Sequence, residues 1–472
     1  MVAAVALCGC TTLSASEKTV SDGGDLVPFS APDALAKTDL ITPEQKSRAI
    51  HNGWWTLYSD DALNALVQDA FSGSPTIAQV RARFVQAQAS ASKSASSLFP
   101  QANISADRGS QRGDNRQASD FTLRGAASFE FDLWGKNHAS AQSTSLSADA
   151  AEEDLHAAAI TLSAGIVESW LRLLSYREQQ RLLEKQIDLN RTILSLQEKR
   201  YEMGVSSALD VLQQQETLAQ SQSLMPDIMA GQDLMLNRLA VLAGKSPSLP
   251  LGIERTGLPA PLPLPETGIS SNLLGDRPDI VAAWLRLQSA DWAHHAANLD
   301  RLPNFDLSAT YATSATKISG LFETWLLDLV AGVAMPVIDG GNRKAEALRT
   351  QALADERFQA YRETVLVAVQ DVEDALSKNA YQARKLKALQ NQLDASKATL
   401  EQAQLAYAHG DSDYINVLRS ISSVQSLERQ IVQARLDLAL DRVALFRALG
   451  GRSWAKPAMD ISDAKTTEGL PS

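Results

Sequence analysis

The stretch Phe121-Thr-Leu-Arg-Gly-Ala-Ala-Ser-Phe-Glu-Phe-Asp-Leu133 alternates between two kinds of side chain along its length. Its odd positions carry Phe121, Leu123, Phe129, Phe131 and Leu133, and its even positions carry Thr122, Arg124, Ser128, Glu130 and Asp132. Successive side chains of a strand point to opposite faces of a sheet. The stretch therefore predicts a β-strand with one apolar face and one polar face.

Three further segments predict strands of the same kind. Residues 102–108 alternate Ala102, Ile104 and Ala106 with polar neighbours, and residues 304–311 alternate around Phe305 and Tyr311. The segment 323–337 alternates less cleanly, because Leu326 and Val330 fall among its polar positions. We therefore expect two β-hairpins, at about 101–133 and 303–337.

A long helix is predicted after each hairpin, near 138–203 and 343–409. Neither segment contains proline. Apolar residues of the first recur every three or four positions, at Leu155, Ala159, Leu162, Ile166, Trp170 and Leu173, which is coiled-coil-like spacing. Gly204 and Gly410 are expected to end these helices, and shorter helices at about 207–244 and 412–449 return. A helix of this length is a rod of roughly 100 Å.

The two halves of the chain repeat one another. Pro75 and Pro100 correspond to Pro278 and Pro303, and Tyr201-x-x-Gly204 corresponds to Tyr407-x-x-Gly410. This similarity predicts an internal duplication, with structural repeats at 75–248 and 278–452. A Pro-rich linker is predicted at 249–277, an N-terminal segment with a helix at 11–74, and a flexible C-terminal tail at 453–472.

Composition excludes several classes of function. The chain has 472 residues and a net charge of -11, which argues against a nucleic-acid partner. Its two cysteines, Cys8 and Cys10, leave the rest of the sequence without a disulfide framework, a Cys-based metal site or a Cys nucleophile. We find no phosphate-binding loop, zincin motif or nucleophile elbow, and we interpret His294-His295 as surface residues. We therefore expect no enzyme activity, no cofactor and no bound metal.

The N-terminus indicates a membrane anchor. Leu7-Cys8-Gly9-Cys10 looks like a bacterial lipobox that follows a short apolar run, although no basic residue precedes it. Residues 1–10 are thus interpreted as a signal peptide with its lipobox, and Cys10 as the better lipidation site because Gly9 precedes it. The alternative is a chance pair of cysteines. By resemblance to lipoproteins, Thr11 favours sorting to the outer membrane.

The predicted strands also indicate how the chain meets a membrane. No run of 18 or more apolar residues occurs, so no spanning helix is expected, and a crossing would need a closed β-barrel. The smallest such barrels have eight strands, and one chain supplies four. At least two chains are required, and three would give twelve strands. The expected fold class is mostly α with transmembrane β: a long antiparallel helical barrel joined to a shared β-barrel.

The sequence resembles the outer-membrane efflux lipoproteins of the TolC/OprM/NodT type. The segments that carry the resemblance are Trp54-Trp55, Phe131-Asp-Leu-Trp-Gly135, Leu273-Leu-Gly-Asp-Arg-Pro-Asp-Ile280, Tyr407-x-x-Gly410 with Val417-Leu418, and Ala448-Leu-Gly-Gly451. The resemblance implies a homotrimer with a twelve-strand barrel in outer-membrane lipid and a twelve-helix periplasmic tunnel. It also implies a periplasmic adaptor protein and an inner-membrane transporter of the resistance-nodulation-division class as partners. The expected function is the passive, gated exit duct of a tripartite efflux pump for drugs or other small toxic compounds.

A gate is expected where the helices turn. By resemblance, Ile415 occupies the family's apolar constriction and Tyr407 is its restraining tyrosine. Three chains would bring the carboxylates of Asp411 and Asp413 near one axis, and such rings favour cations and respond to pH. The alternative is that these residues cap the returning helix. Arg419 stands where the family often has an acid and would pair with an Asp of a neighbouring chain, and Asp210 in the first turn is a weaker candidate.

Two other functions stay open. A type I protein-secretion channel would share this architecture, although the lipobox and Trp54-Trp55 favour drug or metal efflux. A soluble periplasmic coiled-coil scaffold would share the long helices, but the alternating strands with aromatic ends argue against it.

Overall fold

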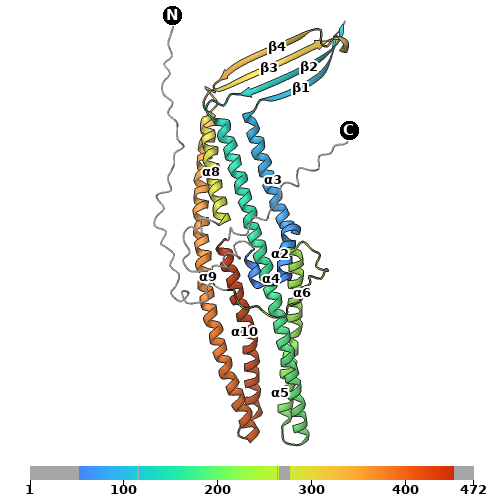
Figure 1. Ribbon diagram of the computed structural model, residues 1–472, viewed down its shortest axis with the longest axis vertical. Helices are drawn as coiled ribbons and strands as arrows, with labels where there is room; N and C mark the ends of the chain where they lie inside the picture. Colours follow the sequence, from blue (N-terminus) through green and yellow to red (C-terminus); the bar gives the residue numbers. More distant parts are fainter. Residues whose placement is uncertain (1–52, 114–115, 263, 265–276, 451–472) are drawn as a thin grey trace.

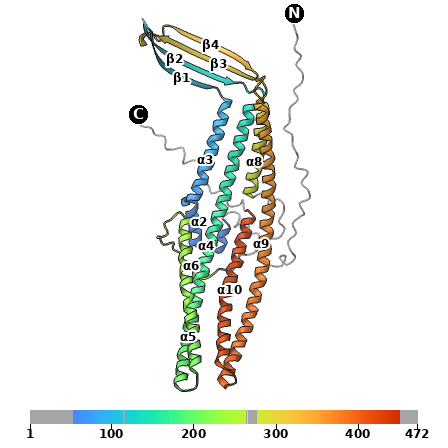
Figure 2. The ribbon, with the colours of Figure 1, turned by 180° about the vertical axis from the view of Figure 1, so that it is seen from behind.

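The computed structural model describes residues 53–113, 116–262, 264 and 277–450, and the predicted lipobox with Cys10 lies outside these residues. The molecule is elongated (Figure 1). A β-sheet lies at one end, long helices run away from it, and two helix-to-helix turns form the opposite end. The reverse view in Figure 2 shows the same separation of sheet and turns.

The sheet has four antiparallel strands in the order β1-β2-β3-β4. The strands are β1 (Gln101–Gly113), β2 (Arg116–Glu130), β3 (Asn304–Ala315) and β4 (Trp325–Ala334). The register aligns Ile104, Gly125, Tyr311 and Leu327 in one row, and Asn103, Ala126, Thr310 and Asp328 in the next. The first row lies on an apolar face, where Ile104 is 82% exposed. Within the described residues, nothing covers this face.

Two details of the sheet depart from simple alternation. Leu326 and Val330 align with Ser105 and Ser128, so the polar face becomes apolar at the β4 edge. In addition, β2 ends at Glu130, before the alternating pattern ends at Leu133. The reason is Asp132, whose carboxylate accepts hydrogen bonds from the backbone amides of Asn137 (3.1 Å) and His138 (2.8 Å). Those amides belong to the first turn of the next helix, so Asp132 serves the helix start rather than the strand.

The helices form an upper and a lower group. The upper group, next to the sheet, contains α3 (Pro75–Ala95), the first part of α4 (Lys136–Glu202), α8 (Pro278–Leu299) and the first part of α9 (Asn342–His409). In the lower group α4 pairs with α5 (Ala208–Ser223) and α6 (Met225–Leu242), and α9 pairs with α10 (Tyr414–Ala448). Because α10 also contacts α4, the lateral order is α9, α10, α4, α6 (Figures 1 and 2).

The helix expected over 207–244 is interrupted. It consists of α5 and α6, which meet at Leu224, and Pro226 occupies the second position of α6. Proline lacks the amide hydrogen that an inner turn needs, and its ring collides with the carbonyl of the preceding turn. The first turn of a helix tolerates it, so α6 starts anew at this point.

The main hydrophobic core lies at mid-height, where the short η2 (Trp54–Tyr58) and α2 (Asp61–Gly73) pack against α4 and α10. Trp170 of α4 is fully buried there, and Trp54 stacks on Phe446 of α10 with ring centroids 5.5 Å apart. By length and composition alone, part of α4 is apolar enough to cross a membrane. However, 61% of that part is buried inside the protein, as expected of a core helix. Two short 3-10 helices complete the described elements: η3 (Ser96–Leu98) and η4 (Ile318–Gly320).

Candidate functional site

At the two turns opposite the sheet, α4 and α9 end with the same backbone conformation and hydrogen bonds. Gly204 ends α4 with φ 75°, and its amide donates to the carbonyl of Tyr201 while the next amide donates to Arg200, both at 2.9 Å. Gly410 ends α9 with φ 82°, and the same two bonds reach Tyr407 (3.1 Å) and Ala406 (2.9 Å). This is the Schellman motif, whose left-handed residue is usually glycine. Both predicted turn glycines occupy that position.

The returning helices start differently. In the first turn Ser207 and Asp210 form a capping box, with reciprocal bonds of 3.2 and 3.1 Å, and the Ser206 hydroxyl donates to the same carboxylate. Asp210 is thus a capping residue. In the second turn Asp413 holds the N-cap position, but its side chain makes no cap bond. The carboxylates of Asp411 and Asp413 are exposed and have no hydrogen-bond or ion-pair partner among the described residues.

Apolar side chains pack just behind the second turn. The half-buried Tyr407 and Ile415 contact a buried cluster of Tyr414, Val417, Leu418 and Ile421. The Tyr407 ring lies 5.5 Å from that of Tyr414, and the Arg200 guanidinium of α4 lies over it at 5.1 Å from its centroid. Tyr407 therefore connects α9 with α4, the first helix of the α4–α5 pair. Arg419 is exposed and has no ion-pair partner among the described residues.

Tyr414 is a residue of this site that the sequence patterns did not indicate. Its ring is buried, and its hydroxyl donates a 2.7 Å hydrogen bond to Oε1 of Gln214 on α5. Burial, with a smaller contribution from Tyr407, raises the pKa of Tyr414 to about 12, so the hydroxyl keeps its proton at alkaline pH values where a free tyrosine has lost it. Gln214 in turn donates to the carbonyl of Asn190 on α4 at 2.9 Å. These two hydrogen bonds connect the second turn with the helix pair α4–α5.

A ladder of buried polar side chains continues this connection away from the turns. Asn190 donates to the Ser221 hydroxyl at 2.8 Å and accepts from Gln425 of α10 at 3.1 Å. Gln186, one turn further along α4, donates to the Gln425 carbonyl at 3.2 Å and accepts from Arg429 at 2.7 Å. A buried polar group left without a partner costs about 1–3 kcal/mol, so the ladder fixes how α4 and α10 align. The available sequence signal was polar residues at core positions of the coiled-coil pattern.

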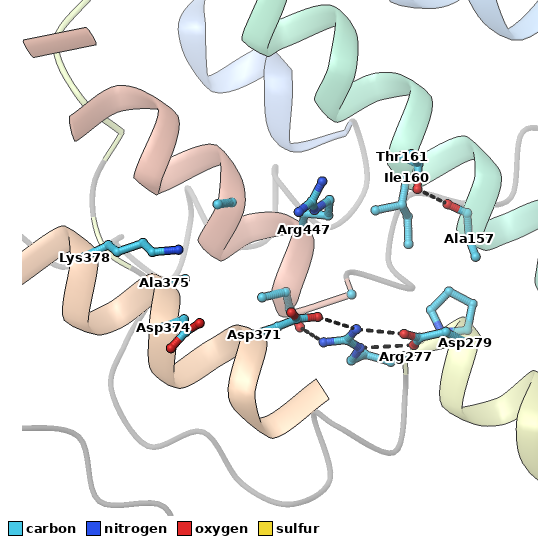
Figure 3. Close-up of a pocket in the computed structure, with 14 residues that line it drawn as sticks. Ala157, Ile160, Thr161, Arg277, Asp279, Asp371, Asp374, Ala375, Lys378 and Arg447 are labelled. Atoms are coloured by element: carbon cyan, nitrogen blue, oxygen red, sulfur yellow. Dashed lines mark hydrogen bonds and ion pairs between the residues drawn. The ribbon is translucent and has the colours of Figure 1, made fainter. Parts of the chain in front are cut away.

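A second polar cluster lies at mid-height, beside a cavity of about 370 Å³ between α4, α8, α9 and α10 (Figure 3). Arg277 forms ion pairs with Asp279 (2.7 Å) and with Asp371 of α9 (3.2 Å), and it donates to the Ala448 carbonyl at the end of α10 (2.9 Å). The Arg-Pro-Asp motif that contributed to the family resemblance is therefore a clasp that joins three helices. Within the described ranges, no group of three or more His, Cys, Asp or Glu side chains is placed to hold a metal ion.

This geometry defines a class of protein chain that has an uncovered sheet at one end and paired helical turns at the other. The family model for outer membrane efflux proteins matches residues 66–245 and 269–451. The pyoverdine export outer membrane protein OpmQ of Pseudomonas aeruginosa is 30% identical over 420 residues, which cover 84% of this chain and 87% of OpmQ. The toluene efflux pump outer membrane protein TtgF of Pseudomonas putida is 25% identical over 459 residues, covering 95% of each chain.

Among solved structures, the outer-membrane channel OprN superimposes with a TM-score of 0.80 at 26% identity, over 90% of this chain and 98% of OprN. The chain belongs to the outer membrane efflux protein family. These relatives are export and efflux proteins of the outer membrane rather than enzymes.

Proposed function

We propose that three copies of this chain form the exit duct of a tripartite efflux pump, which passes small toxic compounds from the periplasm to the exterior. The observation that carries the proposal is the four-stranded sheet, which has free edges at β1 and β4 and an exposed apolar face. Free edges cannot remain in lipid, because each unpaired backbone group there costs several kcal/mol. In a ring of chains, β4 of one copy would pair with β1 of the next, antiparallel like the pairs within the chain.

The distribution of aromatic residues supports a spanning sheet. Tyr311 and Trp325 stack with ring centroids 6.0 Å apart on one part of the apolar face. Phe129 and Phe131 lie 6.3 Å apart near the helix-proximal end of the sheet. Aromatic girdles of this kind mark the two interfaces of membrane barrels. With three chains, the barrel would have twelve strands and the helices would form the periplasmic tunnel.

The turns would then surround the periplasmic aperture. We propose that Asp411 and Asp413 line it, since their carboxylates have no partner among the described residues. Ile415 and Tyr407 would supply the apolar constriction and its restraint, and Arg419 would reach a neighbouring chain. Gly204 and Gly410 shape the turns, and the capping box argues for a structural role of Asp210.

The remaining elements follow from the family. A periplasmic adaptor and an inner-membrane transporter of the resistance-nodulation-division class would deliver the cargo, and an acylated Cys10 would anchor the chain in outer-membrane lipid. Small cargo is favoured over protein because relatives are named for pyoverdine export and toluene efflux. Type I protein secretion and a periplasmic scaffold remain the alternatives.

Two measurements test the proposal. The detergent-extracted full chain is imaged as single particles. A tube with three-fold symmetry is expected, longer than about 100 Å and with a barrel at one end. Compact particles that need no detergent would instead support the scaffold. The gene is then deleted in its host, and susceptibility to drugs and solvents is compared with secretion of proteins. Increased susceptibility with unchanged protein secretion is expected, and the reverse pattern would support type I secretion.

A further inference from the structure

One lateral edge of the lower helices is basic. It is formed by α9, whose charged residues between 378 and 397 are Lys378, Arg384, Lys385, Lys387, Asp394 and Lys397, all exposed. Leu376 packs against Leu445 of α10, and the Gln382 side chain donates to a backbone carbonyl of α10. Tyr381, Arg384 and Lys385 therefore point to the other side of the helix. Tyr381 is 68% exposed, and the Arg384 guanidinium stacks over its ring at 5.6 Å from the centroid.

The other lateral edge is acidic. It is formed by α5 and α6, where residues 208–237 include Asp210, Glu216, Asp227 and Asp233 but no lysine or arginine. The buried residues of α6 are Ile228, Gly231, Leu239 and Ala240, and Ile228 and Gly231 lie against side chains of α4. Asp233 and Leu234 therefore point outward, and Leu234 is 62% exposed. In the described part of the chain, Asp227, Asp233, Lys385 and Lys387 form no ion pair.

The two edges match in height. Both helical turns lie at the same end of the molecule, with α9 on one side and α5 and α6 on the other (Figures 1 and 2). Arg384 lies 25 positions before the end of α9 at His409, and Asp233 lies 25 positions after the start of α5 at Ala208. At 1.5 Å per residue, both lie roughly 37 Å from the turns.

We propose that the basic edge of α9 docks on the acidic edge of α5 and α6 of a second copy of this chain. Tyr381 with Arg384 would pack against Leu234 of the next copy, and Asp233 of that copy would pair with Lys385. Exposed tyrosine and arginine are the residue types that most often anchor interfaces. The sheet edges are ordered in the same way along the chain, because β4 leads into α9 whereas β1 follows α3, which packs on α4. One rotation would therefore close both the sheet and the helical tunnel.

This inference rests on the proposed trimer and specifies which surfaces meet in it. The contact is heterologous, because one edge of each copy meets the opposite edge of the next. Exposed ion pairs contribute little affinity, but complementary charge selects the partner and its register. The seam therefore directs how chains of this protein assemble with one another.

The first test is a cross-link. The pair Asp233→Cys and Lys385→Cys is introduced into the full chain, oxidised, and compared with Asp188→Cys and Lys385→Cys. Asp188 is an exposed acid on α4, which lies between the two edges, so the second pair is the control for adventitious links. Disulfide-linked dimers and trimers are expected for the first pair only.

The second test is a charge swap, read as the fraction of trimer that survives heating in mild detergent. Asp233→Lys and Lys385→Glu should each increase dissociation roughly threefold or more. The double variant should return near the wild-type level, and Asp188→Lys should have no effect. Additive losses in the double variant, or no link between positions 233 and 385 in a wild-type-like trimer, would overturn the seam and leave the proposed function intact. A monomeric wild type in native mass spectrometry would overturn both.

Discussion

The glycines of this chain differ in how much the free energy of unfolding would fall if a side chain were added. Gly410 has a positive φ but open space where a Cβ would stand, whereas at Gly244, with φ 71°, a Cβ would overlap the carbonyl of Gly73. Gly410→Ala should lower the free energy of unfolding by about 1 kcal/mol, from backbone strain alone. Gly244→Ala should lower it by clearly more.

Denaturant unfolding in detergent, followed by helical circular dichroism, checks this order. The matched control is Gly125→Ala, because that position has an ordinary φ and no neighbour within 4 Å of the added Cβ. Equal losses for Gly244→Ala and Gly410→Ala would contradict the close approach of α6 to α2.

Tyr414 makes the stability depend on alkaline pH. Its pKa is raised to about 12 in the folded chain, while an unfolded tyrosine titrates near 10. Between these values the unfolded chain has lost the proton and the folded chain still holds it, so the free energy of unfolding falls as pH rises above about 10. Tyr414→Phe should remove this part of the decline and should cost about 1 kcal/mol at neutral pH, because Gln214 loses its donor.

The measurement is the urea midpoint of wild type and variant at pH 8 and pH 11. The exposed Tyr201 serves as the control, and Tyr201→Phe should leave the pH dependence unchanged. An identical decline in wild type and Tyr414→Phe would contradict the burial of this hydroxyl between the helix pairs α4–α5 and α9–α10.

At the scale of elements, the polar ladder should make the pairing of α4 with α10 specific. Asn190→Leu leaves the side chains of Gln425 and Ser221 without their partner, which should cost about 1–3 kcal/mol. The double variant Asn190→Leu with Gln425→Leu removes both ends of one rung and should recover much of that loss. Chemical unfolding of the two single variants and the double variant forms the cycle, and strictly additive losses would count against the ladder.

Elements with a strong period were predictable, and those that depend on a partner were not. The alternation around Phe129 specified β2 and its apolar face, and the glycine positions specified both turns. The end of β2 was missed because Asp132 bonds to amides that exist only once α4 has formed. The break near Pro226 was readable from proline itself.

The candidate site was predictable only in outline. Tyr407, Asp411 and Asp413 lie at the turn where the pattern placed them, because glycine dictates that turn locally. The contacts among Tyr414, Gln214 and Asn190 join segments that are far apart in sequence. They arise when the helix pair α9–α10 packs against the helix pair α4–α5. A single sequence carries no signal for such pairing beyond polar residues at core positions.

At the scale of the whole molecule, the two exposed acids of the second turn should set the ion preference of the assembled duct. Three chains would place the carboxylates of Asp411 and Asp413 around one aperture, which favours cations. Asp411→Asn with Asp413→Asn should move the reversal potential toward zero in planar bilayers under a KCl gradient. Asp188→Asn, an exposed acid on the side of α4, is the control. An unchanged reversal potential would indicate that the turn acids do not face the ion path.

The continuity of α4 has a mechanical consequence. This helix has 67 residues and is gripped at mid-height, where Trp170 is fully buried. From Trp170 to the turn at its end, α4 continues for roughly 50 Å. Trp170 would therefore be the pivot if the lower part of the helix tilted. A tilt of about 5° about this pivot would displace the end of α4 by about 4 Å. Such a tilt would move the distal end by the width of a small molecule's ring while the sheet at the opposite end of the chain stays in place.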